Sequence, residues 1–161
     1  MDVTLASLLL FLHVAAGFWF VAGLVGRSVA LGRARRSVDL PEIETLLPIA
    51  DRFEKMVIPG SIAVFALGLL TMLAQERPFF EDGGYWLLVS TLLFLSTGLL
   101  VPTIFLPRGK AFEEALEAAR SQAEVTVELV GAFRDPAVAF ARIYEALAVV
   151  VIVALMVLKP F

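Results

Sequence analysis

The sequence has no cysteine, a single histidine and few charged residues, and each shortage excludes a class of function. Without cysteine there can be no disulfides, no thiolate nucleophiles and no Cys-ligated metal centres. Only 18% of the 161 residues are charged, and the net charge of −3 comes with no basic patch interleaved with aromatic residues, so no nucleic-acid partner is expected. The GxSxG, HExxH and P-loop motifs are also missing, which leaves hydrolase, zinc-protease and nucleotide-binding functions without support.

What the sequence has in excess is long apolar segments. Hydrophobic residues make up 60% of the chain and the mean hydropathy is +0.89. Crossing a hydrocarbon core of ~30 Å takes about 20 helical residues. Four segments are long enough, at 5–26, 56–75, 85–107 and 136–158; the first three are uncharged and the fourth contains only Arg142 and Glu145. The sequence therefore predicts an all-α integral membrane protein, an antiparallel bundle of four transmembrane helices in a single domain, 1–161.

The basic residues predict how these helices cross the membrane. The connection 27–55 holds six of them and the connection 108–135 holds four, whereas only Arg77 lies between the second and third segments. By the positive-inside rule, both long connections face the cytoplasm and both termini lie outside. We expect a bacterial cytoplasmic (inner) membrane location. Asp2 takes the place of the positive region that would open a signal peptide, so we expect the first segment to be a retained helix.

Helix-start signals occur in both long connections. Asp39 and Glu42 have the spacing of a capping box, and Pro41 suits an early helical position. A helix is therefore expected to run from about residue 40 into the second span, with a kink at Pro59.

The second long connection predicts two short helices, near 110–120 and 122–133. A second capping-box pattern, Ser121 followed by Glu124, would begin the later one. Asp135 and Pro136 then offer an N-cap and a first-turn proline for the fourth span.

His13 is the main candidate for a functional residue because it lies inside an uncharged span. It shares one helix stripe with Gly17, Phe20, Leu24 and Arg27, and small residues usually mark the face where membrane helices approach closely. One interpretation is a hydrogen bond from His13 to a hydroxyl of the third span. The residues suited to that role are Ser90, Thr91, Ser96 and Thr97.

The alternative interpretation is that His13 is an axial ligand of haem iron, with haem b as the candidate cofactor, or a ligand of another metal. Gly17, Trp19 and Gly23 would then form the binding surface beside it. A bis-histidine site needs a second copy of the chain, which predicts a homodimer. Alternatively, the second ligand would be a methionine, Met72 or Met156.

Arg142 and Glu145 form the second candidate site. They lie three residues apart on one face of the fourth span and can pair, and Arg27 or Arg52 are alternative partners for Glu145. The structural interpretation is an ion pair near the cytoplasmic interface. The functional alternative is an ion-binding or proton-relay carboxylate in a transporter or an accessory membrane subunit.

Several motifs resemble a bacterial family of predicted integral membrane proteins, domain of unknown function 2269. They are FLHVAAGFWFVAGL, ADRFEKMVIPGSIAVFALGL, YWLLVSTLLFLSTGLLVP and the ending VALMVLKPF. The resemblance covers the four spans and implies a four-helix topology, with no established activity.

The segment LHVAAGFWFVAGL is also similar, more distantly, to the first span of the HemJ-type membrane protoporphyrinogen oxidases. In those enzymes a histidine implicated in haem binding is followed by a tryptophan and an Ala-Gly pair. His13 and the pair Ala22-Gly23 keep that spacing, whereas Trp19 lies one residue earlier and the chain has no other histidine. This resemblance implies haem binding at His13.

Three functional hypotheses follow. The leading one is a non-enzymatic membrane protein that binds a small apolar or haem-like ligand through His13. The second is a transporter or accessory subunit that uses Glu145, and the third is a haem-dependent oxidoreductase. The expected partners are the lipid bilayer and a second copy of the chain.

Overall fold

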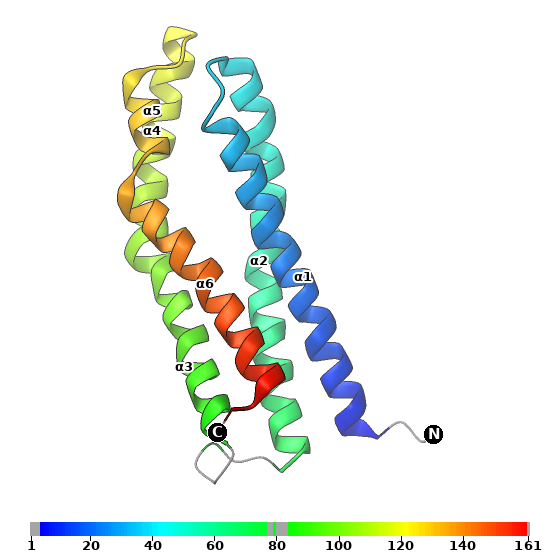
Figure 1. Cartoon of the computed structure of the whole chain (residues 1–161). Helices are drawn as coiled ribbons and strands as arrows, with labels where there is room; N and C mark the ends of the chain where they lie inside the picture. The colour runs from blue at the N-terminus through cyan, green and yellow to red at the C-terminus, as the bar shows by residue number, and fades with distance from the viewer. Residues whose placement is uncertain (1–3, 77–78, 80–83, 161) are drawn as a thin grey trace. The chain divides into compact units, whose positions relative to one another are not determined.

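The computed structural model describes residues 4–76, 79 and 84–160, and every regular element in these ranges is helical. Four helical stretches are long and apolar enough to cross a membrane: Leu5–Ala34, Leu40–Ala74, Tyr85–Gln122 and Val127–Leu158. This confirms the predicted all-α fold with four spans. The chain forms two compact units, residues 1–78 and 79–161 (Figure 1). The prediction that all four spans belong to a single domain stays a prediction.

The first unit is a hairpin of two long helices, α1 (Leu5–Ala34) and α2 (Leu40–Ala74), which lie side by side in Figure 1. Helix α1 begins where the side chain of Thr4 accepts a hydrogen bond from the backbone N–H of Ser7. At 1.5 Å per residue the two helices are about 45 and 52 Å long, which exceeds the ~30 Å hydrocarbon core. Each helix is therefore longer than a span needs, and α2 runs from the connection into the second span as predicted.

Glycines on both helices form the contact between α1 and α2, which we call the glycine seam. Each faces a larger side chain on the other helix: Gly23 faces Val57, Gly26 faces Phe53, Gly60 faces Phe20 and Gly68 faces His13. A methyl group added at Gly26 would overlap the Phe53 ring. Because the contacting residue numbers rise along α1 as they fall along α2, the seam fixes one antiparallel register.

The start of α2 was predicted in position but not in detail. The helix begins at Leu40 with Pro41 in its first turn, as expected, and it continues through Pro59 to its end. Asp39 occupies the N-cap position, but its side chain makes no capping hydrogen bond. The predicted capping box is wrong because the Glu42 carboxylate instead binds Arg33 and Ser37.

The second unit begins with one unbroken helical stretch. Helix α3 (Tyr85–Leu100) passes through a π-helical turn, η1 (Val101–Phe105), into α4 (Leu106–Gln122). Pro102 has no N–H to donate, and the turn widens so that the N–H of Leu106 bonds the carbonyl of Val101 five residues back. The expected break between the third span and a separate helix near 110–120 does not occur.

The remaining helices are α5 (Val127–Phe133) and α6 (Pro136–Leu158). The predicted cap by Asp135 is confirmed, since its carboxylate accepts from the N–H groups of Ala137 and Val138 at 2.8 and 3.2 Å. The capping box at Ser121 is wrong. Its hydroxyl donates back to Ala118, the helix ends at Gln122, and α5 is capped by Thr126 instead.

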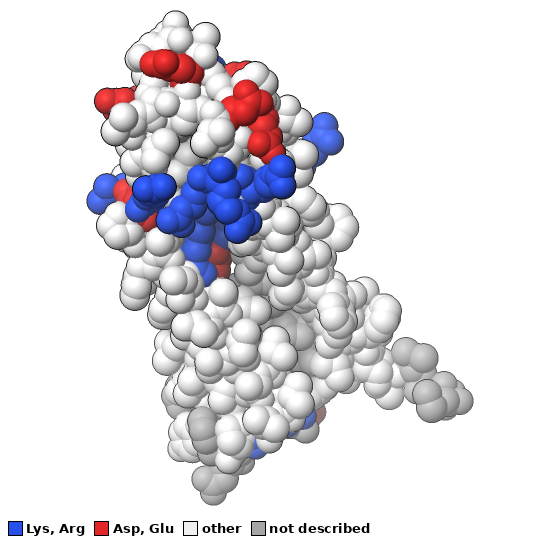
Figure 2. All heavy atoms as spheres, turned by 45° about the horizontal axis from the view of Figure 1, so that its top comes forward, with Lys and Arg blue, Asp and Glu red and all other residues white. Residues whose placement is uncertain are grey.

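The surface has the pattern of a membrane protein. Figure 2 shows a wide area without charged side chains next to the places where Lys, Arg, Asp and Glu gather. Large apolar side chains in the spanning helices are largely exposed, as with Phe18 at 74%. A water-soluble protein seldom exposes so many, whereas lipid tails solvate them.

Candidate functional site

His13 is joined to the second helix by a hydrogen bond within the first unit. Its Nδ1 lies 2.9 Å from the carbonyl oxygen of Val64 on α2. A carbonyl oxygen can only accept, so Nδ1 carries the proton, and a ring without a second proton keeps a lone pair on Nε2. The expected hydroxyl partner on the third span is therefore wrong for Nδ1, which bonds a backbone carbonyl of the second span.

Gly68 allows the imidazole to come this close to α2. A methyl group added there would lie 2.9 Å from Cε1, 3.1 Å from Nδ1 and 3.8 Å from Nε2 of His13. The His13 ring thus occupies the space that a side chain at position 68 would fill. Of these three atoms Nε2 is the farthest from the Gly68 position, and it has no hydrogen bond within the described residues.

The other residues of the predicted ligand surface lie in two different environments. Gly23 is packed against Val57 in the glycine seam, and the Trp19 ring borders Gly60. Gly17, one turn from His13, has open space beside it, because an added methyl group would meet nothing within 4 Å among the described residues. Gly17 therefore borders open space, while Gly23 packs within the glycine seam.

Arg27, the first charged residue after the apolar run of α1, lies farther along the seam. It is only 6% exposed, and its Nη1 donates to Oε2 of Glu54 at 2.7 Å. Glu54 had not been predicted as a partner. Nothing in the sequence aligns positions 27 and 54 until the glycine seam sets the register of the two helices.

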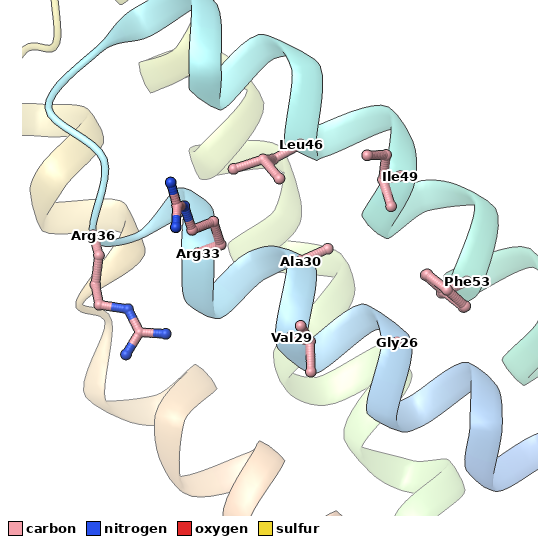
Figure 3. A pocket seen from close by; sticks show the side chains of 8 residues that line it. All are labelled: Gly26, Val29, Ala30, Arg33, Arg36, Leu46, Ile49 and Phe53. Carbon is pink, nitrogen blue, oxygen red and sulfur yellow. The ribbon is translucent and has the colours of Figure 1, made fainter.

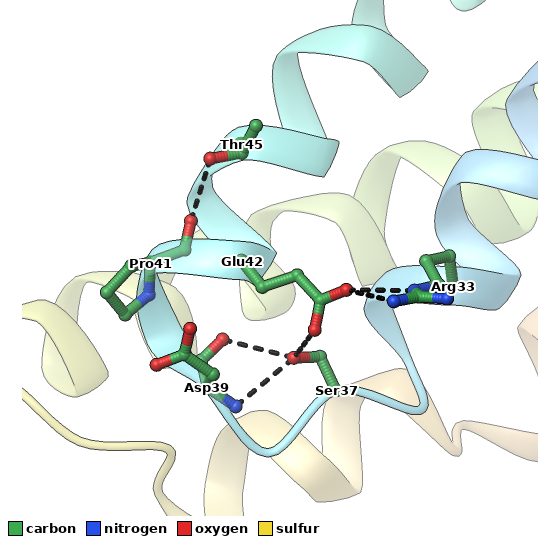
Figure 4. Close-up of polar contacts among 6 residues, drawn as sticks. All are labelled: Arg33, Ser37, Asp39, Pro41, Glu42 and Thr45. Carbon is green, nitrogen blue, oxygen red and sulfur yellow. Dashed lines mark hydrogen bonds and ion pairs between the residues drawn. The ribbon is translucent and has the colours of Figure 1, made fainter.

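A further polar cluster closes the connection between α1 and α2 (Figure 4). The Glu42 carboxylate accepts from Arg33 at 2.8 Å and from the Ser37 hydroxyl at 2.6 Å. Glu42 precedes the uncharged part of α2, so it lies outside the spanning segment. The hydrogen bond from Ser37, and next the one from Arg33, hold the pKa of Glu42 below its usual value. This carboxylate is therefore ionised at neutral pH.

The described residues contain no group of three or more His, Asp or Glu side chains that would hold a metal ion. A metal bound by protein ligands alone is therefore unsupported in that part of the chain. Of the metal hypotheses, axial ligation of haem iron by His13 is the one that needs no such group.

The comparison with known families agrees with this architecture. A family model described as "Predicted integral membrane protein (DUF2269)" matches residues 7–160. The chain belongs to the DUF2269 family. No curated protein and no solved structure matches the chain. The match places this DUF2269 protein in a membrane, which agrees with its four apolar helices.

The second predicted site of the DUF2269 protein lies on α6. Glu145 is 9% exposed in a span whose other charged residue, Arg142, is half-buried one turn before it. Both side chains have interaction partners. Their pairing with each other stays a prediction.

Two hydroxyl groups of the third span have partners within the second unit of the DUF2269 protein. Ser96 and Tyr144 share a hydrogen bond of 2.6 Å that joins α3 to α6, and Thr97 donates to the carbonyl of Phe94 in its own helix. Ser90 is 1% exposed, and its hydroxyl has no hydrogen-bond partner in the described part of the chain. Two of the four hydroxyls suggested for His13 are thus bonded elsewhere.

Proposed function

We propose that this DUF2269 protein is a non-enzymatic protein of the bacterial cytoplasmic membrane that binds a haem-like ligand through Nε2 of His13. The observation that carries the proposal is the hydrogen bond from Nδ1 to the Val64 carbonyl. Histidines that ligate metals commonly donate their other ring N–H to a backbone carbonyl, which fixes the tautomer and raises the basicity of the ligating nitrogen. His13 is held in this arrangement.

The neighbouring residues of α1 and α2 fit this role. Val64 orients the ring, Gly68 lets it lie against α2, and Gly17 leaves space on α1 one turn away. A bound haem would supply an iron centre for electron transfer or for binding a diatomic gas. Because the chain has one histidine, a second imidazole must come from another copy. The proposal therefore includes a two-fold homodimer, with the long connections facing the cytoplasm.

The test is the visible spectrum of the full chain, purified in mild detergent from cells supplied with a haem precursor. We expect a Soret band that is lost in His13→Asn. The asparagine amide can still donate to Val64 from the position of Nδ1, but it has no counterpart of Nε2. Loss of the band with unchanged thermal unfolding therefore reports lost ligation rather than lost packing.

A second pair of variants tests the space beside His13. Gly17→Leu would fill it, whereas Gly98→Leu fills comparable open space on α3 in the other unit. We expect Gly17→Leu to lower haem content at least severalfold and Gly98→Leu to leave it unchanged. A colourless but folded wild-type protein, or a Soret band that survives in His13→Asn, would reject the proposal.

A second candidate function, a transporter or accessory subunit, is favoured by the burial of Glu145 in α6. Ionisable groups inside membrane helices often mark ion or proton pathways. The test is proton or cation flux in proteoliposomes. A folded Glu145→Gln variant should lose this flux, and equal flux in the two proteins would end the idea.

A further inference from the structure

A groove lies between α1 and α2 on the connection side of the Gly26–Phe53 contact. Its volume is about 480 Å³, and its floor is apolar, with Gly26, Val29 and Ala30 from α1 and Leu46, Ile49 and Phe53 from α2. Figure 3 shows these side chains on the two facing helices, with Arg33 and Arg36 at the end nearest the connection. The groove is thus apolar at one end and basic at the other.

The depth of this groove in the bilayer follows from the sequence of α1. The uncharged run ends at Gly26, so Gly26 and the facing Phe53 lie at the edge of the hydrocarbon core. Arg33 lies seven residues, about 10 Å, farther along the helix axis. Its guanidinium binds Glu42, in the first turn of α2, at the connection end of the groove. The groove therefore extends from the edge of the hydrocarbon core outward into the headgroup region.

The charges at the basic end are available to an anion. Glu42 already binds Arg33 at 2.8 Å and leaves part of its guanidinium exposed. Arg36 is exposed and has no ion pair within the described residues. No carboxylate lines the groove. At the basic end of the groove, the charge of Arg33 is therefore balanced by Glu42, and the charge of Arg36 is not balanced by a carboxylate within the described residues.

We propose that this groove binds one anionic phospholipid of the surrounding bilayer, with the phosphate at Arg36 and Arg33. The glycerol ester region and the adjoining first part of an acyl chain would cover the apolar floor, including Val29, which is 67% exposed. Guanidinium groups bind phosphate oxygens through paired hydrogen bonds, and basic pockets between membrane helices on the cytoplasmic side suit anionic headgroups. This site does not involve His13 and is independent of haem binding.

The headgroup contact is tested with the full chain in mild detergent, by native mass spectrometry during titration with phosphatidylglycerol or phosphatidylcholine. We expect one phosphatidylglycerol to bind more tightly than phosphatidylcholine. Arg36→Gln should weaken phosphatidylglycerol binding about fivefold, the effect of one basic side chain near the surface. Arg35→Gln is the matched control, because Arg35 is the adjacent exposed arginine and does not line the groove.

The acyl contact is tested by filling the groove. Val29→Trp should abolish tight phosphatidylglycerol binding, whereas Val25→Trp, at another exposed valine outside the groove, should not. If Arg36→Gln and Arg35→Gln weaken phosphatidylglycerol binding equally, the lipid is attracted by the general surface charge, and the proposed site is wrong. Unchanged binding in Val29→Trp would overturn it as well. If Val29→Trp alters the oligomeric state while no lipid binds, the groove holds a second copy of the chain and the proposal is wrong.

Discussion

The two units of the molecule use glycine in opposite ways. In the first unit, Gly26 and Gly68 are in close contact with the partner helix, and polar groups cross between α1 and α2 at both His13 and Arg27. In the second unit, Gly98 stands in open space, although a polar contact again joins two helices, Ser96 of α3 to Tyr144 of α6. The fit of glycines against large side chains therefore fixes how α1 and α2 are aligned. The polar contacts of His13 and Arg27 with α2 form only in that alignment.

The largest test of this contrast is Gly26→Ala against Gly98→Ala. The new methyl group at Gly26 would overlap the Phe53 ring, so we expect a loss of about 1–3 kcal/mol in the free energy of unfolding. At Gly98 nothing obstructs the methyl group, and alanine favours the helix, so the change should be neutral or slightly stabilising. Unfolding in mixed detergent micelles measures both. Equal changes in stability in the two variants would contradict the distinction between the units. Phe53→Leu removes the ring that the new methyl group would meet, so it should restore part of the stability lost in Gly26→Ala.

The next test concerns the ion pair at the edge of the apolar run. Glu54→Gln removes the charge that faces the buried Arg27, and we expect a loss of about 1–2 kcal/mol, because the Glu54 side chain is 43% exposed and partly screened. Asp51→Asn breaks the exposed pair with Lys55 and should cost less than about 0.5 kcal/mol. Similar losses of stability in the two variants would mean that the burial of Arg27 does not strengthen its ion pair with Glu54.

A smaller effect is expected at the interhelical hydrogen bonds. His13→Ala should lower the free energy of unfolding by about 1 kcal/mol, and Ser96→Ala, which removes the bond to Tyr144, by about 0.6 kcal/mol. His13→Asn should lie close to the wild type. A larger loss for Ser96→Ala than for His13→Ala would reverse the comparison between the units.

The smallest effect is the pH dependence of the cluster at Glu42. Because the pKa of Glu42 is lowered in the folded protein, its contribution to stability is present above the unfolded value of about 4.5 and is lost as the pH falls through the folded value. Ser37→Ala removes the largest cause and should raise the pKa of Glu42. Carbon-detected NMR titration of labelled glutamates would show this, and an unchanged titration would contradict the assignment.

Much of the fold was predictable because it depends on length and local pattern. Four uncharged or nearly uncharged segments and the cap at Asp135 were sufficient to place the spans and the start of α6. The error at Ser121 has a local cause, since a hydroxyl that bonds its own helix cannot cap the next one. The unbroken passage through Pro102 depends on a π-helical turn, which sequence spacing does not reveal.

The candidate site was predictable only in part. The sequence singled out His13 and Arg27 because polar groups inside or at the end of an apolar run are conspicuous. Their partners, the Val64 carbonyl and Glu54, depend on how α1 and α2 are aligned. That alignment comes from the fit of glycines against large side chains. A one-residue slip would change every pair.

The unbroken helical stretch Tyr85–Gln122 has a mechanical consequence. At 38 residues it is about 57 Å long, nearly twice the ~30 Å thickness of the hydrocarbon core. It contains no loop, and the one place in it where the regular α-helical hydrogen bonding changes is the π-helical turn Val101–Phe105. A tilt of 10° in the membrane would displace that end by several ångströms, so this helix can act as a lever between lipid and water.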